Sequence, residues 1–227
     1  MNIYHIDQII SFRKTKEEYG GLSNMCAGFK LLINDVPVLT SEAMYQACRF
    51  PHLPEVQKEI IKQKSPMAAK MVGKPYKQNT RDDWDNVNVK IMGWCLRAKL
   101  AQNFLKFGQL LESTNGKQIL EDSHKDDFWG AIKDKANPKV FKGQNKLGKL
   151  LTRLRDLYNS DDRYSLLLLE PIDIPDFILY SEPIKTINET EKFSTMITSL
   201  KNENNIQIKK KSNEDQSFSG EQTTFFD

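Results

Sequence analysis

The stretch KDDFWGA (125–131) places acidic and aromatic side chains together in a predicted loop. Asp126, Trp129 and Gly130 lie close to one another within it. An acid beside an aromatic wall can orient a sugar hydroxyl or stabilise a positive charge, and loops carry functional groups more often than core elements do. A solvated turn with one anchoring tryptophan is the alternative interpretation of the same residues.

Arg81 and Trp84 form a second candidate pair at the start of a predicted helix. An exposed guanidinium and an indole can hold a flat anionic ligand by charge pairing and stacking. In the other interpretation the indole packs on the core, and Asp82 and Asp83 complement the positive end of the helix dipole. The local sequence favours this second interpretation.

TSEAMYQACRF (40–50) predicts a short amphipathic helix with a carboxylate in its first turn. Glu42, Gln46 and Arg49 recur at i, i+4 and i+7, so their side chains share one face of that helix. A carboxylate at this position suits the helix dipole, and the polar stripe can also carry chemistry. Taken alone, the stretch favours the dipole role for Glu42.

FKGQNKLGKLL (141–151) places Gly143 and Asn145 immediately before a predicted helix. Backbone N–H groups at a helix N-terminus bind phosphate readily, but glycine and asparagine are also ordinary residues at the start of a helix. The stretch lacks the Gly-Lys-Ser/Thr ending of a P-loop. It predicts at most a local phosphate site.

Neither a metal site nor a cofactor is predicted. The cysteines are odd in number and contain no Cys-x-x-Cys pair, and the histidines have no metal-binding spacing. These residues are Cys26, Cys48, Cys95, His5, His52 and His124. We therefore expect reduced, buried thiols in a cytoplasmic protein.

The bulk composition sets further limits on function. The chain has 227 residues and a net charge of +3 from 33 basic and 30 acidic residues, which is too mild to imply general nucleic-acid binding. No signal segment follows the first methionine. The longest apolar run, LLLL at 166–169, is far too short to span a membrane, so no membrane association is expected.

The elements that must position these residues are mainly helices with a few strands, an α+β pattern. A short strand or arm is predicted at 1–11, and strands are predicted in GFKLLI and INDVPVL (28–39) and at 117–122. Residues 123–144 are predicted as a loop. Helices are predicted at 40–50, 54–64, 65–74, 83–104, 106–114 and 145–158. We expect one domain at 1–158, a docked arm or short extension at 159–184, and a mostly disordered tail at 185–227 with a brief helix at 193–200.

Six stretches in chain order say more than any one of them alone. They are YGGLSNM (19–25), TSEAMYQACRF (40–50), SPMAAKMVG (65–73), RDDWDNVNVKIMGWCLRAKLAQN (81–103), LEDSHKDDFWG (120–130) and KGQNKLGKLLTRLRDLY (142–158). The series resembles the ordered motifs of the YbiA/NADAR family over roughly residues 11 to 158. Six motifs in the same order are hard to obtain by chance.

The resemblance implies an α+β fold with one active-site cleft and an N-glycosidase that splits the C1′–N bond of a ribosylated base. Two substrate types are implied: phosphoribosylamino-pyrimidines of early riboflavin synthesis, and ADP-ribose attached to guanine. Glu42 and Asp126 occupy the positions of a catalytic acid pair, and Lys99 is the lysine we expect to form a Schiff base if the opened ribose is trapped instead. The residues expected to bind substrate are Asn24, Gln46, Arg49, Arg81, Trp84, Trp129, Gly130 and Asn145.

Departures from the family pattern keep an alternative open. Ala43 stands where the family has His, and Arg49 stands where it has Lys; an arginine can hold a phosphate but cannot form a Schiff base. A non-catalytic module that binds ADP-ribose or a nucleotide is therefore the alternative hypothesis.

Two partner predictions concern the loop between Gly130 and Gly143 and the last residues of the sequence. Lysines cluster in the predicted loop, at Lys133, Lys135, Lys139 and Lys142, and favour a larger anionic ligand such as ADP-ribose or ADP-ribosylated nucleic acid. The ending EQTTFFD (221–227) loosely resembles peptides that bind a sliding clamp.

Overall fold

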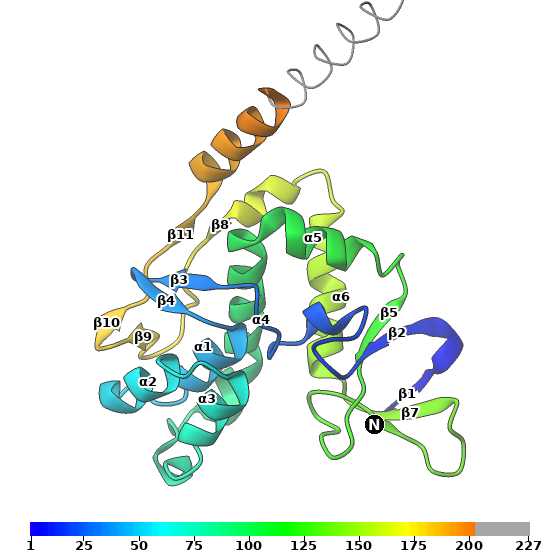
Figure 1. The fold of residues 1–227 in the computed structure, drawn as a ribbon. Coiled ribbons are helices and arrows are strands. Elements are labelled where there is room, and N and C mark those ends of the chain that lie inside the picture. Colours follow the sequence, from blue (N-terminus) through cyan, green and yellow to red (C-terminus); the bar gives the residue numbers. More distant parts are fainter. Residues whose placement is uncertain (203–227) are drawn as a thin grey trace, which may run out of the picture. The chain divides into compact units, whose positions relative to one another are not determined.

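A computed structural model describes residues 1–202 of the chain. It divides into one compact unit, Met1–Asn188, and a second unit that begins at Glu189. The first unit has an α+β fold, as predicted, in which short strands flank a group of helices (Figure 1). None of the helices in the described part combines the length and the apolar character that a membrane span requires.

The helices fall where their end signals predict them. Thr40 caps α1 by accepting the Ala43 N–H at 3.2 Å, and Ser65 caps α3 with Pro66 at the first helical position. Their bounds are α1 Ser41–Ala47, α2 Pro54–Ile61, α3 Pro66–Val72, α4 Trp84–Gln102, α5 Phe104–Glu112 and α6 Lys146–Tyr158.

Helix α4 lies at the centre of the first unit (Figure 1). It contacts α1, α5 and α6, and α1 in turn contacts α2 and α3. Ile91, Cys95 and Ala98 of α4 are fully buried, on the stripe that the sequence pattern predicts. Burial on nearly all sides of α4 makes it the support on which the other helices are positioned.

The strands pair in small sheets. Strand β2 (Ile9–Phe12) runs parallel to β5 (Gln118–Glu121), while β3 (Leu31–Ile33) and β4 (Val36–Val38) form a hairpin. β1 (Asn2–His5), β7 (Val140–Gly143) and β6 (Ile132–Lys133) form a three-stranded sheet in that order. The prediction of a continuous loop at 123–144 is therefore wrong at its C-terminal end, because β7 pairs with β1 from the distant N-terminus.

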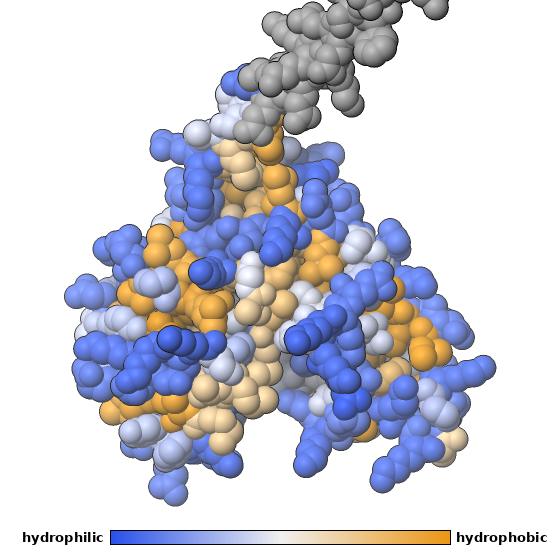
Figure 2. All heavy atoms as spheres, in the orientation of Figure 1, coloured by the Kyte–Doolittle hydropathy of each residue, from blue (hydrophilic) through white to orange (hydrophobic). Residues whose placement is uncertain are grey.

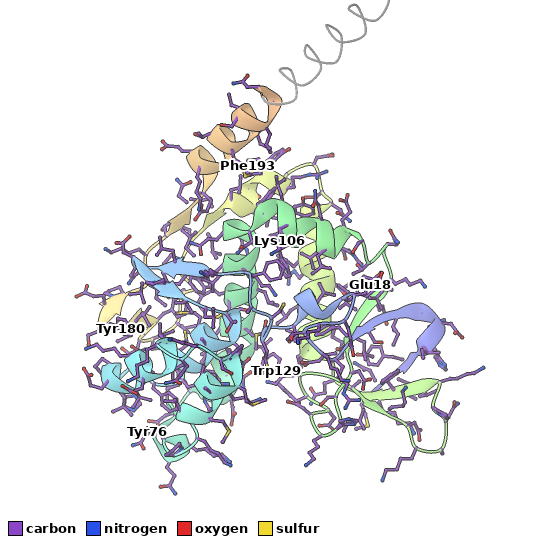
Figure 3. The ribbon with its side chains drawn as sticks, viewed as in Figure 1. Glu18, Tyr76, Lys106, Trp129, Tyr180 and Phe193 are labelled. Atoms are coloured by element: carbon purple, nitrogen blue, oxygen red, sulfur yellow. The ribbon has the colours of Figure 1, made fainter. Side chains whose placement is uncertain are left out.

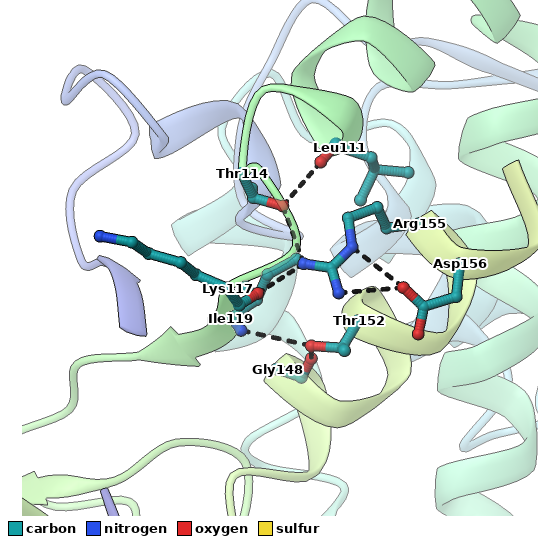
Figure 4. A network of polar contacts seen from close by, with 8 residues as sticks. All are labelled: Leu111, Thr114, Lys117, Ile119, Gly148, Thr152, Arg155 and Asp156. Carbon is teal, nitrogen blue, oxygen red and sulfur yellow. Dashed lines mark hydrogen bonds and ion pairs between the residues drawn. The ribbon is translucent and has the colours of Figure 1, made fainter. Parts of the chain in front are cut away.

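A buried arginine fixes β5 against α6 (Figure 4). Arg155 donates to the Thr114 hydroxyl at 3.0 Å and to the Lys117 carbonyl, and its guanidinium also pairs with Asp156. Thr152 accepts the Ile119 N–H at 3.2 Å and donates to the Gly148 carbonyl at 2.9 Å. These bonds tie the start of β5 to α6 and so fix the direction in which β5 leads to its last residue, Glu121.

Residues after α6 continue the first unit, with a short 3₁₀ helix at Arg163–Leu167 and strands β8 (Leu168–Leu169), β9 (Ile178–Leu179), β10 (Glu182–Pro183) and β11 (Ile187–Asn188). Trp94 of α4 donates its indole N–H to the Glu170 carbonyl at 3.0 Å and meets Phe177 edge-on, with ring centroids 5.0 Å apart. Because β11 pairs with β8 and Ile187 is buried, a disordered tail does not begin at residue 185.

The described part of the second unit is helical at residues 190–202, which includes the brief helix predicted at 193–200. The peptide at 221–227, for which a clamp partner is predicted, lies outside the described residues.

Candidate active site

A cavity of about 100 Å³ collects side chains from elements that are distant in sequence. Trp129 lies where α1–α3 face the β-rich side of the first unit, and the molecular surface is indented between these two sides (Figures 2 and 3). The lining residues are Ser23, Asn24, Met25, Glu42, Tyr45, Gln46, Lys70, Met92, Glu121, Asp126, Trp129 and Leu147. Glu42, Asn24, Gln46, Asp126 and Trp129, all predicted as site residues, thus meet at one cavity.

Glu42 enters the cavity from the first turn of α1. The residue is 7% exposed, and its Oε1 accepts a hydrogen bond from Gln46 Nε2 at 2.9 Å. Burial raises the pKa of Glu42 above its usual value, while the Gln46 hydrogen bond and the charges of Lys70 and Arg49 oppose that rise. A buried carboxyl of this kind suits acid–base chemistry better than simple compensation of a helix dipole.

The loop before α1 is held against the start of that helix. The Asn24 carbonyl accepts the Glu42 N–H at 3.2 Å, and Ser41 donates its hydroxyl to Asn24 Oδ1 at 3.2 Å. The Asn24 amide group also donates to the sulfur of Met92. Asn24 is therefore held at the cavity wall, next to Glu42.

Lys99 lies in the core behind this loop and does not line the cavity. Its ammonium group donates to the Gly21 carbonyl at 2.6 Å and to the Ser23 carbonyl at 3.1 Å. It also lies 4.6 Å and 4.2 Å from the ring centroids of Phe29 and Phe107. The structure thus separates Lys99 from the site, and a Schiff base at this lysine has no geometric support.

Asp126 lies at the opposite wall, in the turn after β5. Its Oδ1 accepts the backbone N–H groups of Phe128 at 3.1 Å and Trp129 at 2.9 Å, and its own N–H donates to the Ser123 hydroxyl at 2.9 Å. The carboxylate is exposed and is held in one orientation by its own turn. Asp126 can therefore present its other oxygen to a ligand.

The aromatic wall differs from the predicted one. Tyr45 lines the cavity between two tryptophans, with ring centroids 5.0 Å from Trp84 and 5.6 Å from Trp129. Trp84 therefore lies behind Tyr45, where it supports the wall without lining it. The sequence predicted an aromatic wall, but the position of Tyr45 shows only in the fold.

Arg81 is buried, which corrects the expectation of an exposed guanidinium. It pairs with Asp83, to which its Nη2 donates at 2.9 Å, and it also donates to the Pro175 carbonyl at 2.5 Å. Both partners satisfy the charge and donors of Arg81 away from the candidate site. Arg81 instead borders a separate open pocket of about 560 Å³ with His52 and Asp176.

Gly130 and Asn145 support the site from outside the cavity. A Cβ atom on Gly130 would lie 2.4 Å from the Glu121 carbonyl oxygen, so only glycine fits there. Asn145 has a left-handed backbone (φ 51°), and its side chain donates to the Ile119 carbonyl at 2.8 Å and accepts the Glu121 N–H at 3.2 Å. Both residues therefore fix β5 and the turn that follows it.

Two charged residues at the cavity were not selected from the sequence. Glu121 ends β5; burial, and then the negative charges of Asp126 and Glu42, raise its pKa to about 7. Lys70 of α3 places an exposed ammonium group at the cavity. Both lie within stretches that carry the family resemblance, but nothing in their local sequence marks them as neighbours of Glu42.

The departures from the family pattern lie behind the cavity. Ala43 is buried in the core, and the Arg49 guanidinium lies over the Trp84 ring at 5.4 Å, so neither lines the cavity.

Two of the lysines predicted to favour an anionic ligand contact other residues of the β6–β7 hairpin. Lys142 pairs with Asp134, and Lys133 lies 5.3 Å from the Phe141 ring centroid.

Within residues 1–202, no group of three His, Cys, Asp or Glu side chains has a geometry that could hold a metal ion.

A family model, the related sequences and a solved structure all indicate the same family. The model of the NADAR domain matches residues 11–158. N-glycosidase YbiA of Escherichia coli K12 is 34% identical over 157 residues, covering 68% of this chain and 92% of that protein. A riboflavin biosynthesis protein of Vibrio vulnificus is 29% identical over 163 residues, covering 71% of this chain and 41% of that protein. The NMR structure of E. coli YbiA superimposes with a TM-score of 0.56 at 31% identity, covering 66% of this chain and 84% of that chain.

Proposed function

The chain belongs to the NADAR domain family, and from this premise we propose that it is an N-glycosidase that hydrolyses the C1′–N bond between a phosphorylated ribosyl group and a base. The observation that carries the proposal is the meeting of three carboxyl groups at one small cavity. These belong to Glu42, Glu121 and Asp126, and Lys70 supplies a cation beside them.

Hydrolysis of an N-glycosyl bond needs one carboxyl group in each protonation state. As the C1′–N bond breaks, positive charge develops at C1′, which a carboxylate stabilises, and the departing nitrogen needs a proton from an acid. Acids that crowd into a buried site repel each other's negative charge, so they lose their protons over different pH ranges. The cavity can therefore hold a carboxylate and a carboxylic acid together near neutral pH.

We assign these two roles from the hydrogen bonds. Burial raises the pKa of both groups, but Glu42 accepts from the Gln46 amide, which favours its carboxylate form. At Glu121 the negative charges of Asp126 and Glu42 add to burial and raise the pKa to about 7. In the proposed step the oxygen of a water molecule bonds to C1′, and Glu42 takes the proton that this water loses. The electron pair of the C1′–N bond passes to the nitrogen, which takes its proton from Glu121.

Asp126 and Lys70 bind the substrate in this scheme. Asp126 stands at the exposed edge of the cavity and can accept hydrogen bonds from the ribose hydroxyls, and Lys70 can pair with a phosphate. The cavity of about 100 Å³ is below the roughly 300–1,000 Å³ of sites that enclose whole drug-sized ligands. We propose that it takes the ribosyl group, while the rest of the substrate lies in the surface indentation.

Two substrates meet this description: a phosphoribosylamino-pyrimidine of riboflavin synthesis, and guanine that carries ADP-ribose. A relative named for riboflavin biosynthesis supports the first. Lysines of the β6–β7 hairpin, Lys135 and Lys139, are exposed and support the larger anion.

The test is base release from both substrates, measured by chromatography, for the wild type and E42Q. We expect the wild type to release base from at least one substrate and E42Q to release it at least about 100-fold more slowly. E55Q is the matched control, because the Glu55 side chain is 80% exposed on α2. Full activity in E42Q, or no release by the wild type from either substrate, would refute the proposal.

A second candidate function rests on the two departures from the family pattern. With Ala43 and Arg49 in place of His and Lys, the chain would bind ADP-ribose or a nucleotide without cleaving it. Calorimetry with ADP-ribose beside the release assay separates the two functions. If the wild type binds ADP-ribose but releases no base, the non-catalytic binding function is favoured.

A further inference from the structure

Two polar side chains of α1, Glu42 and Gln46, and Arg49 of the turn that follows it form a directed chain of hydrogen bonds that ends at Glu42. Arg49 Nη1 donates to Gln46 Oε1 at 3.2 Å, and Gln46 Nε2 donates to Glu42 Oε1 at 2.9 Å. Gln46 and Glu42 line the cavity, whereas Arg49 lies behind them. The side chains at i, i+4 and i+7 thus form a hydrogen-bonded relay that runs from the turn after α1 to the first turn of that helix.

The chemistry of arginine fixes the direction of this relay. A glutamine amide can rotate by half a turn and exchange its oxygen with its NH₂ group, so on its own it can either donate to a carboxylate or repel it. A guanidinium group only donates. With Arg49 bound to one side of the amide, that side must be the oxygen, and the NH₂ group must face Glu42.

Arg49 is itself held in place. Its Nη2 donates to the Thr80 hydroxyl at 3.0 Å, and its guanidinium lies 5.4 Å from the Trp84 ring centroid and 5.6 Å from that of Phe50. The guanidinium is therefore oriented by contacts that do not involve the substrate cavity. Its hydrogen-bonded connection to Glu42 runs through Gln46, and its positive charge also lowers the pKa of Glu42.

From this geometry we propose that Arg49 is a positioning residue: it locks the Gln46 amide so that its NH₂ group donates to Glu42, and it thereby keeps Glu42 in the carboxylate form. The inference rests on the proposed function, because it assigns Arg49 the task of preparing the group that faces C1′. It also gives Trp84 and Thr80 a role, since they orient the guanidinium.

Other charged or titratable groups lie near Glu42. They are Lys70 on α3, Cys95 on α4, Glu121 at the end of β5, Asp126 in the following turn, Tyr45 on α1 and Arg49 in the turn that follows α1. Burial raises the pKa of Glu42, and the Gln46 hydrogen bond is the largest influence that lowers it. All these groups except Arg49 stay unchanged when Arg49 alone is replaced.

The experiment is an NMR titration of the Glu42 carboxyl carbon in protein labelled with ¹³C-glutamate, with the signal assigned by its loss in E42Q. A double-mutant cycle compares the wild type, R49M, Q46M and the double variant Q46M/R49M. We expect R49M to move the Glu42 midpoint upward by about one pH unit when Gln46 is present. In the Q46M background the same replacement should move it by less than half as much.

Two outcomes would overturn the inference. Equal shifts in both backgrounds would mean that Arg49 acts on Glu42 by charge alone, and no shift in either would mean that it does not act on Glu42.

R49K is the conservative variant. Its cation also only donates, so its Glu42 midpoint should lie closer to that of the wild type than to that of R49M. If circular dichroism shows that R49M does not fold, R49Q takes its place in the cycle.

The titration is independent of turnover, so failure of the relay and failure of the proposed function are distinguishable. If the wild type releases base, the acidic limb of the kcat/KM profile should also move to higher pH in R49M, because the carboxylate form of Glu42 is then lost at a higher pH. A purely structural role for Arg49 would lower the rate equally at every pH. If the wild type releases no base, the glycosidase proposal fails while the titration still decides the relay.

Discussion

At Glu121, burial and two neighbouring acids all raise the pKa of the carboxyl group. The side chain lines the same cavity as the solvent-exposed Asp126 and the buried Glu42, and its pKa rises to about 7. Gln46 donates to Glu42, which opposes the effect of burial on the pKa of that residue. Burial thus raises the pKa of both acids, while the Gln46 hydrogen bond favours the carboxylate form of Glu42 and the neighbouring negative charges favour the protonated form of Glu121.

If Glu121 donates the proton to the leaving base, activity needs its protonated form. The rate should then fall as pH rises through about 7 in the wild type. E121Q should lose this basic limb and be slower below pH 7 by about 100-fold or more, because an amide cannot supply a proton. The pH dependence of kcat for both proteins checks this. A basic limb that persists unchanged in E121Q would show that another group gives the proton.

Lys99 should make stability depend on pH, because its pKa in the folded protein is lowered to about 7 by burial. Between about pH 7 and the ordinary value of 10.5, the unfolded chain binds more protons at this residue than the folded chain does. The free energy of unfolding should therefore rise with pH in this range, by about 1 kcal/mol per unit from Lys99.

Urea unfolding of the wild type and K99M at pH 7.5 and 9.5 measures this contribution. The difference between the two proteins isolates Lys99, because the other titrating groups are shared. A difference that does not change with pH would mean that the two carbonyls and the two rings keep the lysine charged throughout.

The sequence selected Glu42 and Asp126 because each belongs to a short motif with a recognisable pattern. Lys70 and Glu121 could not be found in the same way, since their importance comes from lying beside Glu42 after α3 and β5 are packed. The motif that contains Lys99 predicted a site residue, but the structure buries this lysine outside the cavity. There it donates to two carbonyls of the loop before α1 and holds that loop in place. Residue type shows what a side chain can do, and only packing shows what it faces.

At the scale of elements, helices were predictable because their end signals are local. Thr40, Ser65 and Pro66 lie where α1 and α3 begin. Strand β7 was missed because its four residues, VFKG, show no clear alternation, and the partner that makes them a strand is β1. Strand β5 was predicted, but its parallel pairing with β2 is a property of the folded chain alone.

The junction of β5 and α6 depends on Asn145, which supplies two side-chain hydrogen bonds and a left-handed backbone. N145A should lower the free energy of unfolding by about 2–3 kcal/mol, because both bonds are lost and alanine is strained at this φ. N145G loses the same bonds without the strain, so it should be the milder change.

Chemical unfolding of N145A and N145G measures the two contributions. Since Asn145 accepts the N–H of Glu121, base release should fall in both variants even under conditions where they remain folded. Wild-type activity in a folded N145A would mean that this bond does not position Glu121.

At the scale of the whole first unit, the folded chain extends beyond the segment that matches the NADAR domain. The NADAR match ends at residue 158, but the unit extends to Asn188. Beyond residue 158 the segment buries apolar side chains, namely Leu166, Leu167, Leu169, Phe177, Leu179, Ile184 and Ile187. It covers Trp94 of α4, and it forms two hydrogen bonds with the Gln57 side chain of α2. Gln57 donates to the Ile178 carbonyl and accepts the Tyr180 N–H.

This segment therefore belongs to the fold of the first unit, and removing it should destabilise the helices that position Glu42. A chain of residues 1–158 would expose Trp94 and leave the Gln57 side chain without its partners at Ile178 and Tyr180. Each buried apolar side chain contributes about 1.5–3 kcal/mol before conformational entropy is subtracted, so even part of this sum is large beside the roughly 5–15 kcal/mol stability of a typical domain. A chain of residues 1–188 keeps every one of these contacts and is the matched control. We expect thermal unfolding of 1–188 to follow that of the full chain, and 1–158 to aggregate or to melt at least about 10 °C lower. Equal melting temperatures for the two truncated chains would mean that α4 is stable without this cover, and that residues 159–188 serve a purpose other than holding the site.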